Sequence, residues 1–191
     1  MVDSERETTN RIEELWNDHR ELVAYLQSDN QLQLSSRVED AFSKTLIIAA
    51  ASYFEVQLTQ IIIDLYFEMT QGAEILVSFV RKQAIGRRFA QLFNWGDETQ
   101  SSQNANSFYR LFGSDFSDHM KQKIQDDRAL DESVKAFLEI GNLRNQMVHG
   151  NYADFKLNKT VEDVYVLYKT ASTFLNAFPI AIRECTSHGK V

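Results

Sequence analysis

The chain of 191 residues has the length of a single domain, and its apolar content of 43% is sufficient to form a hydrophobic core. The formal net charge of −7 argues against a general nucleic-acid coat, which would usually be basic, but it leaves room for a local basic site. Glycine is sparse and there is only one proline, whereas a fold of many short strands needs more turn-forming residues. We therefore expect a single domain of long helices over residues 1–191.

Cys185 is the only cysteine, so the chain cannot form an internal disulfide, and its first residues do not resemble a signal peptide. Both features predict a protein of the reducing cytoplasm. No apolar run reaches the length of a membrane span, because the most apolar segment, residues 46–51, is soon followed by Glu55 and Gln57. We therefore expect no membrane partner.

The first predicted helix begins at a capping-box pattern, in which Ser4 is followed by Glu7. Helix-forming residues then continue to about residue 27. Apolar side chains recur along this segment at helical spacing: Ile12, Leu15, Trp16, Leu22, Val23 and Leu26. The polar segment 28–33 is expected to be a loop.

The second predicted helix begins at another capping-box pattern, Ser36 followed by Glu39, and covers residues 36–69. Its expected inner face consists of Val38, Phe42, Thr45, Leu46, Ala49, Tyr53, Val56, Gln57 and Ile61. Three isoleucines at 61–63 would also suit a strand, but the surrounding helical period argues against one. The alanines at 49–51 would let another helix approach closely, so we expect this helix to be central to the fold.

The middle of the chain, after Gly72, is expected to contain shorter helices around residues 73–83 and 86–94. The stretch 95–105 has a glycine and several Ser, Gln and Asn residues, which predicts an exposed loop. Gly113 should interrupt a short packed segment formed by Phe108, Leu111, Phe112 and Phe116.

The third major helix is expected over residues 132–149, with Asp131 as its N-cap. Gly150 and Asn151 should end it, because a glycine often follows the last turn of a helix.

The last major helix is expected to begin where Thr160 is followed by Asp163. Its core-facing stripe is Val164, Leu167, Tyr168, Ala171, Phe174, Leu175 and Phe178. Pro179 should kink or end this helix. The predicted fold class is therefore all-α, an antiparallel helical bundle with a long insertion between its second and third major helices.

Residues 141–150, Gly-Asn-Leu-Arg-Asn-Gln-Met-Val-His-Gly, contain the most informative pattern in the chain. Its Arg-Asn-x-x-x-His core, made by Arg144, Asn145 and His149, resembles the signature of the HEPN superfamily. The nearest subgroup is the bacterial one associated with RNA processing and phage defence. Outside this segment the resemblance extends to the order of the helices and to Glu55, because such domains often have a glutamate on the long early helix.

The resemblance implies an all-α domain of HEPN type. Many HEPN domains are metal-independent endoribonucleases that act as dimers, and others have lost catalysis and serve as binding or scaffolding modules. For this chain the resemblance implies that Arg144, Asn145 and His149 are catalytic, with Glu55 and Asn142 in support.

The residue types in this motif suit RNA cleavage without a metal. A base must take the proton from the 2′-OH, and the unperturbed pKa of histidine lies near neutrality. A cation must stabilise the charge that grows on the phosphate, and the planar guanidinium of arginine matches phosphate oxygens. The product would be a 2′,3′-cyclic phosphate, so DNA, which lacks the 2′-OH, would not be cut.

Helix geometry places a constraint on this site. Asn142, Asn145 and His149 lie near one line of the helix. Arg144 is five residues before His149 and points about 140° away from it, at ~100° per residue. A single helix therefore aims Arg144 and His149 poorly at one phosphate. An altered last turn would correct this, and so would a symmetric dimer that places two motif segments around one cleft.

Each motif residue also has a structural interpretation. Arg144 would serve as an ion-pair partner of Glu55 or Glu139, and His149 as a positively charged C-cap of its helix. Glu55 would either orient Arg144 or point to solvent, since a glutamate among apolar residues is costly unless it is paired.

Other candidate features are weaker. Arg81, Lys82, Arg87 and Arg88 form the densest basic cluster, which either guides an RNA backbone or is a solvated helix face. The aromatic residues Phe108, Tyr109, Phe112 and Phe116 are more typical of a core than of a base-stacking surface. His19, His119 and His188 lack metal-ligand spacing, so neither a metal site nor any other cofactor is expected.

Our first hypothesis is a dimeric, metal-independent endoribonuclease that cleaves RNA by 2′-OH attack in phage defence or in a toxin–antitoxin system. RNA and a regulatory or antitoxin protein are its expected partners. The second hypothesis is a non-catalytic HEPN module that binds a partner protein or a nucleotide. The third is a plain helical-bundle interaction protein without such a site.

Overall fold

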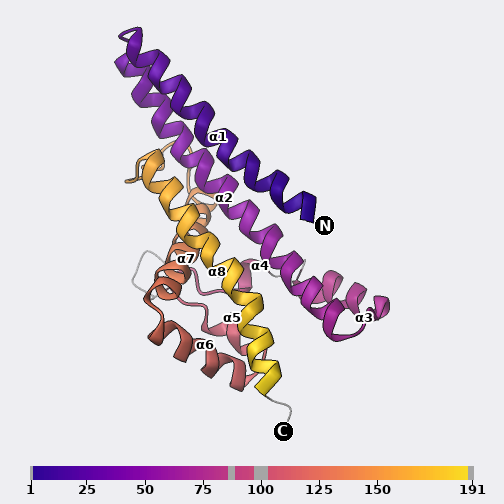
Figure 1. The fold of residues 1–191 in the computed structure, drawn as a ribbon. Coiled ribbons are helices and arrows are strands. Elements are labelled where there is room, and N and C mark those ends of the chain that lie inside the picture. The colour runs from indigo at the N-terminus through magenta and orange to yellow at the C-terminus, as the bar shows by residue number, and fades with distance from the viewer. Residues whose placement is uncertain (1, 86–88, 97–102, 189–191) are drawn as a thin grey trace.

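The computed structural model describes residues 2–85, 89–96 and 103–188. Its architecture is all-α, an antiparallel helical bundle, and the predicted fold class is confirmed (Figure 1). The bundle is formed by α1 (Val2–Ser28), α2 (Leu32–Met69), α7 (Arg128–His149) and α8 (Val161–His188). Between α2 and α7 lies the long insertion, with α3 (Glu74–Phe79), the π-helix η1 (Val80–Ile85), α4 (Phe89–Leu92), α5 (Asn106–Arg110) and α6 (Ser114–Asp126).

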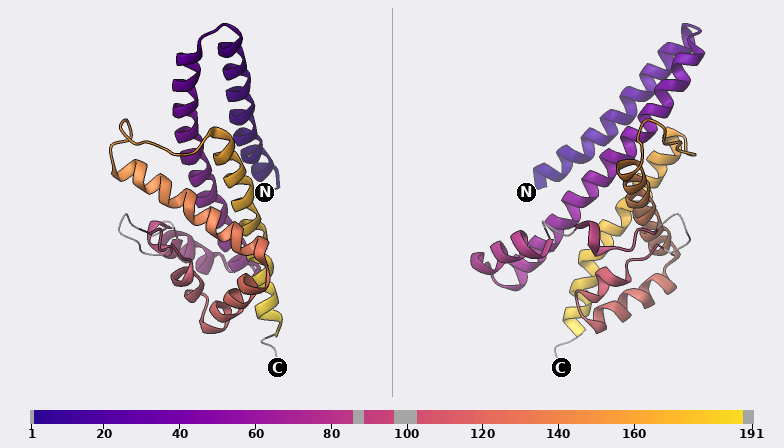
Figure 2. Two further views of the ribbon diagram at one scale, coloured as in Figure 1. Left: turned by 90° about the vertical axis from the view of Figure 1, so that its left-hand side faces the viewer. Right: turned by 180° about the vertical axis from the view of Figure 1, so that it is seen from behind.

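The first two helices form an antiparallel hairpin that extends beyond the rest of the bundle (Figure 2). Their connection is shorter than predicted, and Asn30 adopts a left-handed conformation there, with φ of 58°. Both predicted capping boxes are wrong, because Ser4 and Ser36 lie inside helices that begin at residues 2 and 32. Gln31 precedes α2 without a side-chain cap, so packing between the two helices, rather than a local cap, determines where α2 begins.

α2 is the central helix, since it packs against α1, α7 and α8. Its burial is therefore broader than a single stripe, and Ile47, Ala50, Phe54 and Leu58 are almost fully buried. The predicted inner face was wrong at Val56, which is 59% exposed, and at Thr45, which is also exposed. The segment at 61–63 is helical, as predicted.

The prediction about membrane spans requires a correction. By length and composition, α2 is apolar enough to cross a membrane, and it is the one such helix within the described residues. This apolar stretch of α2 also supplies core residues of the bundle, and 39% of it is buried, so core packing accounts for that part of its composition.

α7 begins one turn earlier than predicted. Its N-cap is Asp127, not Asp131, and the Asp127 carboxylate accepts hydrogen bonds from the backbone N–H groups of Ala129 and Leu130 at 2.9 and 3.1 Å. The predicted end at His149 is confirmed, and the Gly150 N–H donates to the Gln146 carbonyl at 2.9 Å. A Cβ atom at Gly150 would lie 2.7 Å from that carbonyl oxygen, so only glycine fits this close turn.

α8 begins at the predicted capping box. The Thr160 N–H donates to the Asp163 carboxylate at 2.9 Å, and the Asp163 N–H donates to the Thr160 hydroxyl at 3.1 Å. Pro179 does not end the helix, which continues to His188. Packing of the following residues, including the buried Ala181 and Ile182, holds the chain helical past the proline.

The insertion differs from its prediction in detail. α6 was not predicted, and it packs against α7 and α8, where Lys123 pairs with Glu184 at 2.5 Å. Gly113 interrupts the helices as predicted, with φ of 100°. The aromatic cluster is core as expected: Phe108, Phe112 and Phe116 all contact Phe178 of α8.

α1 is held to the bundle by aromatic stacking around His19. Its Trp16 ring stacks on Tyr165 of α8 at 4.4 Å between centroids. The His19 ring lies 5.0 Å from the Phe42 ring, is 2% exposed, and has no hydrogen-bonding partner for either nitrogen among the described residues.

Candidate functional site

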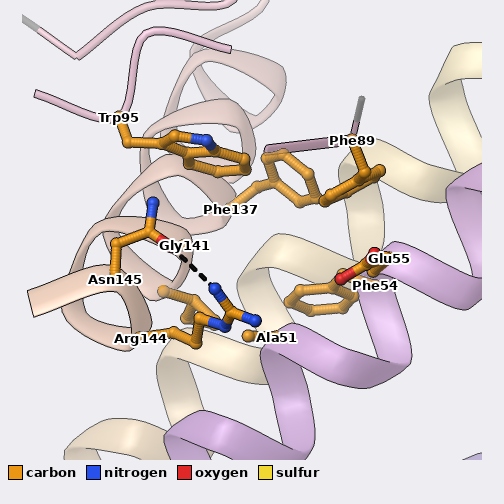
Figure 3. Close-up of a pocket in the computed structure, with 10 residues that line it drawn as sticks. Ala51, Phe54, Glu55, Phe89, Trp95, Phe137, Gly141, Arg144 and Asn145 are labelled. Atoms are coloured by element: carbon orange, nitrogen blue, oxygen red, sulfur yellow. Dashed lines mark hydrogen bonds between the residues drawn. The ribbon is translucent and has the colours of Figure 1, made fainter. Parts of the chain in front are cut away.

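The motif helix α7 and the central helix α2 enclose a small pocket with the insertion (Figure 3). Its cavity volume is about 100 Å³. It is lined by Ala51, Phe54 and Glu55 of α2, by Phe137, Ile140, Gly141, Arg144 and Asn145 of α7, and by Phe89 and Trp95 of the insertion. The pocket therefore brings together three residues that the sequence singled out, from two distant segments: Glu55, Arg144 and Asn145.

Gly141 determines how the insertion covers this pocket. A Cβ atom built on Gly141 would overlap the indole ring of Trp95, so only glycine lets that ring lie directly on α7. The Trp95 ring also contacts the rings of Phe93 and Phe137, at 4.9 and 5.9 Å between centroids. The prediction that 95–105 is an exposed loop is wrong at both of its ends, because Trp95 is half-buried and Ala105 is buried.

Arg144 projects into the pocket and is held there by its neighbour. Its guanidinium donates a hydrogen bond to the Asn145 side-chain oxygen at 3.0 Å. The ion pairs considered for Arg144 are not formed in this chain: Glu139 pairs with Lys159 at 2.8 Å, and no ion pair joins Arg144 to Glu55. Among the residues that the structure describes, the guanidinium therefore keeps donors that no carboxylate engages.

Glu55 lies across the pocket from Arg144, on α2 (Figure 3). Its side chain is exposed, and no hydrogen bond or ion pair to it is formed within the described residues. Because Glu55 lines the same pocket as Arg144 without contacting it, the pocket has a cationic and an anionic side that are both open to a ligand.

His149 lies outside this pocket. It is the last residue of α7, it is exposed, and no side chain in the described part of the protein forms a hydrogen bond or ion pair with it. The C-cap of α7 is Gly150, so the imidazole is not required to end the helix. Arg144 and His149 thus do not converge within one chain, as the ideal helix geometry predicted.

Asn142 and the described part of the basic cluster do not line the pocket. The Asn142 side-chain oxygen accepts a hydrogen bond from Gln146 at 3.3 Å, and Asn142 does not line the pocket. Arg81 and Lys82 are exposed on η1. Arg87 and Arg88 lie outside the described residues.

His19 and His119 have surroundings typical of structural residues. His19 is buried, and His119, on α6 of the insertion, lies 3.4 Å from the Glu184 carboxylate of α8. Within the described ranges, no three His, Cys, Asp or Glu side chains are placed to hold a metal ion.

Most of the pocket lining was missed by sequence reasoning, including Phe89, Trp95, Phe137 and Gly141. A glycine in the middle of a helix is a signal of close packing, because glycine weakens a helix unless its lack of a side chain is used. Gly141 was therefore detectable as a contact position. Nothing in the sequence indicated that its partner would be Trp95.

The family model for RiboL-PSP-HEPN matches residues 13–184. The match includes all of the motif and the pocket residues, and it leaves out only the two ends of the chain. No curated protein and no solved structure matches the chain significantly.

Proposed function

Because this chain belongs to the RiboL-PSP-HEPN family, we propose that it is a metal-independent endoribonuclease. The family match by itself supports a nuclease or RNA-related module. The proposal adds a reaction: the 2′-OH of RNA attacks the adjacent phosphate, and the bond from phosphorus to the 5′-oxygen of the next nucleotide breaks. The products are a 2′,3′-cyclic phosphate end and a 5′-hydroxyl end, the latter formed when the leaving oxygen takes up a proton.

The observation on which the proposal rests is the arrangement at the end of α7. Arg144 enters a pocket with donors that no carboxylate of the described residues engages, and His149 is exposed five residues further along the same helix. In the proposed reaction His149 takes the proton from the 2′-OH, and Arg144 stabilises the charge on the phosphate. Asn145 positions Arg144 through their hydrogen bond.

The proposed active form is a symmetric dimer. His149 is exposed and lies outside the pocket that holds Arg144, so a second copy of the motif helix would bring a histidine and an arginine of different chains to one phosphate. Two arginines in one cleft would also offset the acidic charge of −7 locally and attract RNA.

The proposed setting is phage defence or a toxin–antitoxin system in the cytoplasm, with a regulatory protein that restrains the activity. An RNA-cleaving site that needs no metal or other cofactor has no intrinsic off-state, which is the physical reason to expect such a partner.

The deciding experiment is incubation of purified protein with mixed RNA in EDTA. Wild type should cut RNA and leave cyclic phosphate ends, and His149→Ala should lose about 10²- to 10⁴-fold in rate, which is the usual contribution of general acid–base catalysis. His119→Gln is the control, because it removes an imidazole far from the motif. Equal rates for wild type and His149→Ala would exclude the mechanism.

The second candidate is a non-catalytic module that binds a partner protein or a nucleotide. It is favoured by one observation, the separation of Arg144 from His149 in the single chain. A protein that remains monomeric at micromolar concentration and cuts no RNA would establish this alternative.

A further inference from the structure

We propose that the pocket between α2, α7 and Trp95 binds a guanine base of the RNA, next to the phosphate that is cut. This inference rests on the proposed ribonuclease function and adds a sequence preference to it. It starts from a feature that proton transfer and phosphate binding do not explain, the aromatic lining of the pocket.

The walls of the pocket suit a flat aromatic ligand. Four aromatic residues line it, and they come from three parts of the chain: Phe54, Phe89, Trp95 and Phe137. They contact one another, with 6.2 Å between the Phe89 and Trp95 centroids and 5.7 Å between those of Phe54 and Phe137. Phe54 and Phe137 also belong to the hydrophobic core, whereas Phe89 and Trp95 of the insertion are only half-buried. Half-buried aromatic rings beside polar groups suit a nucleobase, which stacks on aromatic side chains through its π-face.

The polar groups of the pocket lie on opposite sides of this lining. The Asn145 side-chain oxygen accepts from Arg144, which leaves its amide nitrogen as a donor on the Trp95 side of the pocket (Figure 3). Across the pocket, Glu55 offers two carboxylate oxygens that accept. A ligand held by both groups must therefore accept a hydrogen bond at one end and donate at the other, where two donors would use both carboxylate oxygens.

Guanine is the RNA base that meets this requirement. Its Watson–Crick edge has the O6 acceptor beside two adjacent donors, the N1–H and the N2 amino group. The carboxylate of Glu55 would accept from both donors, and the Asn145 amide would donate to O6. Adenine and cytosine offer a carboxylate only one amino group, and uracil offers one N–H between two acceptors, so each would form fewer bonds here.

The position of Arg144 connects this pocket to the cleavage chemistry. Its guanidinium lies between the Asn145 amide and the side of the pocket that Glu55 lines, and it has five donors, of which one bonds to Asn145. A base seated in the pocket therefore places its own phosphate within reach of the remaining donors. This geometry predicts cleavage beside guanosine.

The first test is binding, which does not depend on catalysis. His149→Ala protein is titrated with each of the four nucleoside 5′-monophosphates, and GMP should bind roughly 5- to 100-fold more tightly than the others, as a bidentate base contact would give. Glu55→Gln in the same background should remove this preference, because the amide replaces one acceptor by a donor. Glu21→Gln, an exposed glutamate of α1, is the matched control and should bind as its parent does. Equal binding of the four nucleotides, or an unchanged preference in Glu55→Gln, overturns the proposal.

The second test is cleavage, and it separates this proposal from the ribonuclease itself. Ends mapped after digestion of a random-sequence RNA in EDTA should be enriched beside guanosine for wild type and Glu21→Gln, and the enrichment should fall for Glu55→Gln. Cleavage without any base preference overturns the guanine pocket and leaves the ribonuclease. Glu55-dependent GMP binding without cleavage overturns the ribonuclease and supports a site for free guanine nucleotides.

Discussion

The two ends of the Arg-Asn-x-x-x-His motif have very different surroundings. Arg144 is half-buried in a pocket built by α2, α7 and the insertion, and its orientation is set by Asn145. His149, only five residues later, is exposed and has no bonding partner among the described side chains. The fold of one chain therefore orients Arg144 and leaves His149, the proposed base, without a partner among the described residues. The predictions below test this difference.

The largest effect is expected for Arg144→Lys. Lysine keeps the charge but cannot form the planar fork that binds two phosphate oxygens, so RNA cleavage should fall about 10²- to 10³-fold. Circular dichroism should remain that of wild type, and Lys123→Arg on α6 is a control for exchanging the two cations. A rate within about threefold of wild type would mean that Arg144 supplies only charge.

A mixture of two inactive variants should regain activity if the site is shared between chains. Arg144→Ala contributes an intact His149, and His149→Ala contributes an intact Arg144. After the two are unfolded together and refolded, random pairing should restore up to about one quarter of the wild-type rate, since half of the dimers are mixed and each has one complete site. A mixture no more active than its components would place both residues of a site in one chain.

Gly141→Ala should test the pocket wall without touching a charged group. The new Cβ overlaps the Trp95 ring, so the free energy of unfolding should fall by about 1–3 kcal/mol, as for other overpacked positions. Chemical denaturation measures the change, and Gly113→Ala, where a Cβ meets nothing within 4 Å but φ is positive, separates overlap from backbone strain. Combining Gly141→Ala with Trp95→Leu should recover part of the loss. If the change in the free energy of unfolding of the double variant equals the sum of the two single changes, the two residues are not coupled.

The smallest effect concerns a second histidine whose surroundings are opposite to those of His149. Burial lowers the pKa of the His19 imidazole, and the nearby carboxylates of Glu162 and Glu39 raise it by less. The unfolded chain then takes up a proton near pH 6.5 and the folded chain only at lower pH, so the free energy of unfolding should decrease as the pH falls below about 6.5. His19→Leu should flatten that part of the stability curve. An identical slope in the variant would assign the pH dependence to other groups.

The elements that could be predicted from sequence are those set by local patterns. The end of α2 at Met69, the end of α7 at His149 and the Thr160–Asp163 capping box all agree with the structure, because each depends on residues within one turn. Helix starts that depend on tertiary packing were not predictable, and the early beginning of α2, without a side-chain cap, is an example.

The candidate site also has a part that the sequence predicts and a part that it does not. Arg144 and Glu55 were identified by pattern, and the offset of Arg144 from His149 follows from the geometry of α7. The contact of Trp95 with Gly141 joins the insertion to the motif helix, and neither residue's neighbours predict it. The inner face of α2 was partly mispredicted for a related reason, since a helix packed on three sides has no single apolar stripe.

The long insertion between α2 and α7 also has a consequence for synthesis of the protein. Glu55 and Arg144 face one pocket, but roughly 90 residues separate them, which a ribosome adds in on the order of 5–20 s at about 5–20 residues per second. During that interval α2 can pack against α1, α3 and η1, but the apolar surface that it later buries under α7 and α8 is exposed. A nascent chain therefore passes through a period in which it is prone to aggregate but has no pocket, and the pocket first forms when α7 docks on a finished insertion.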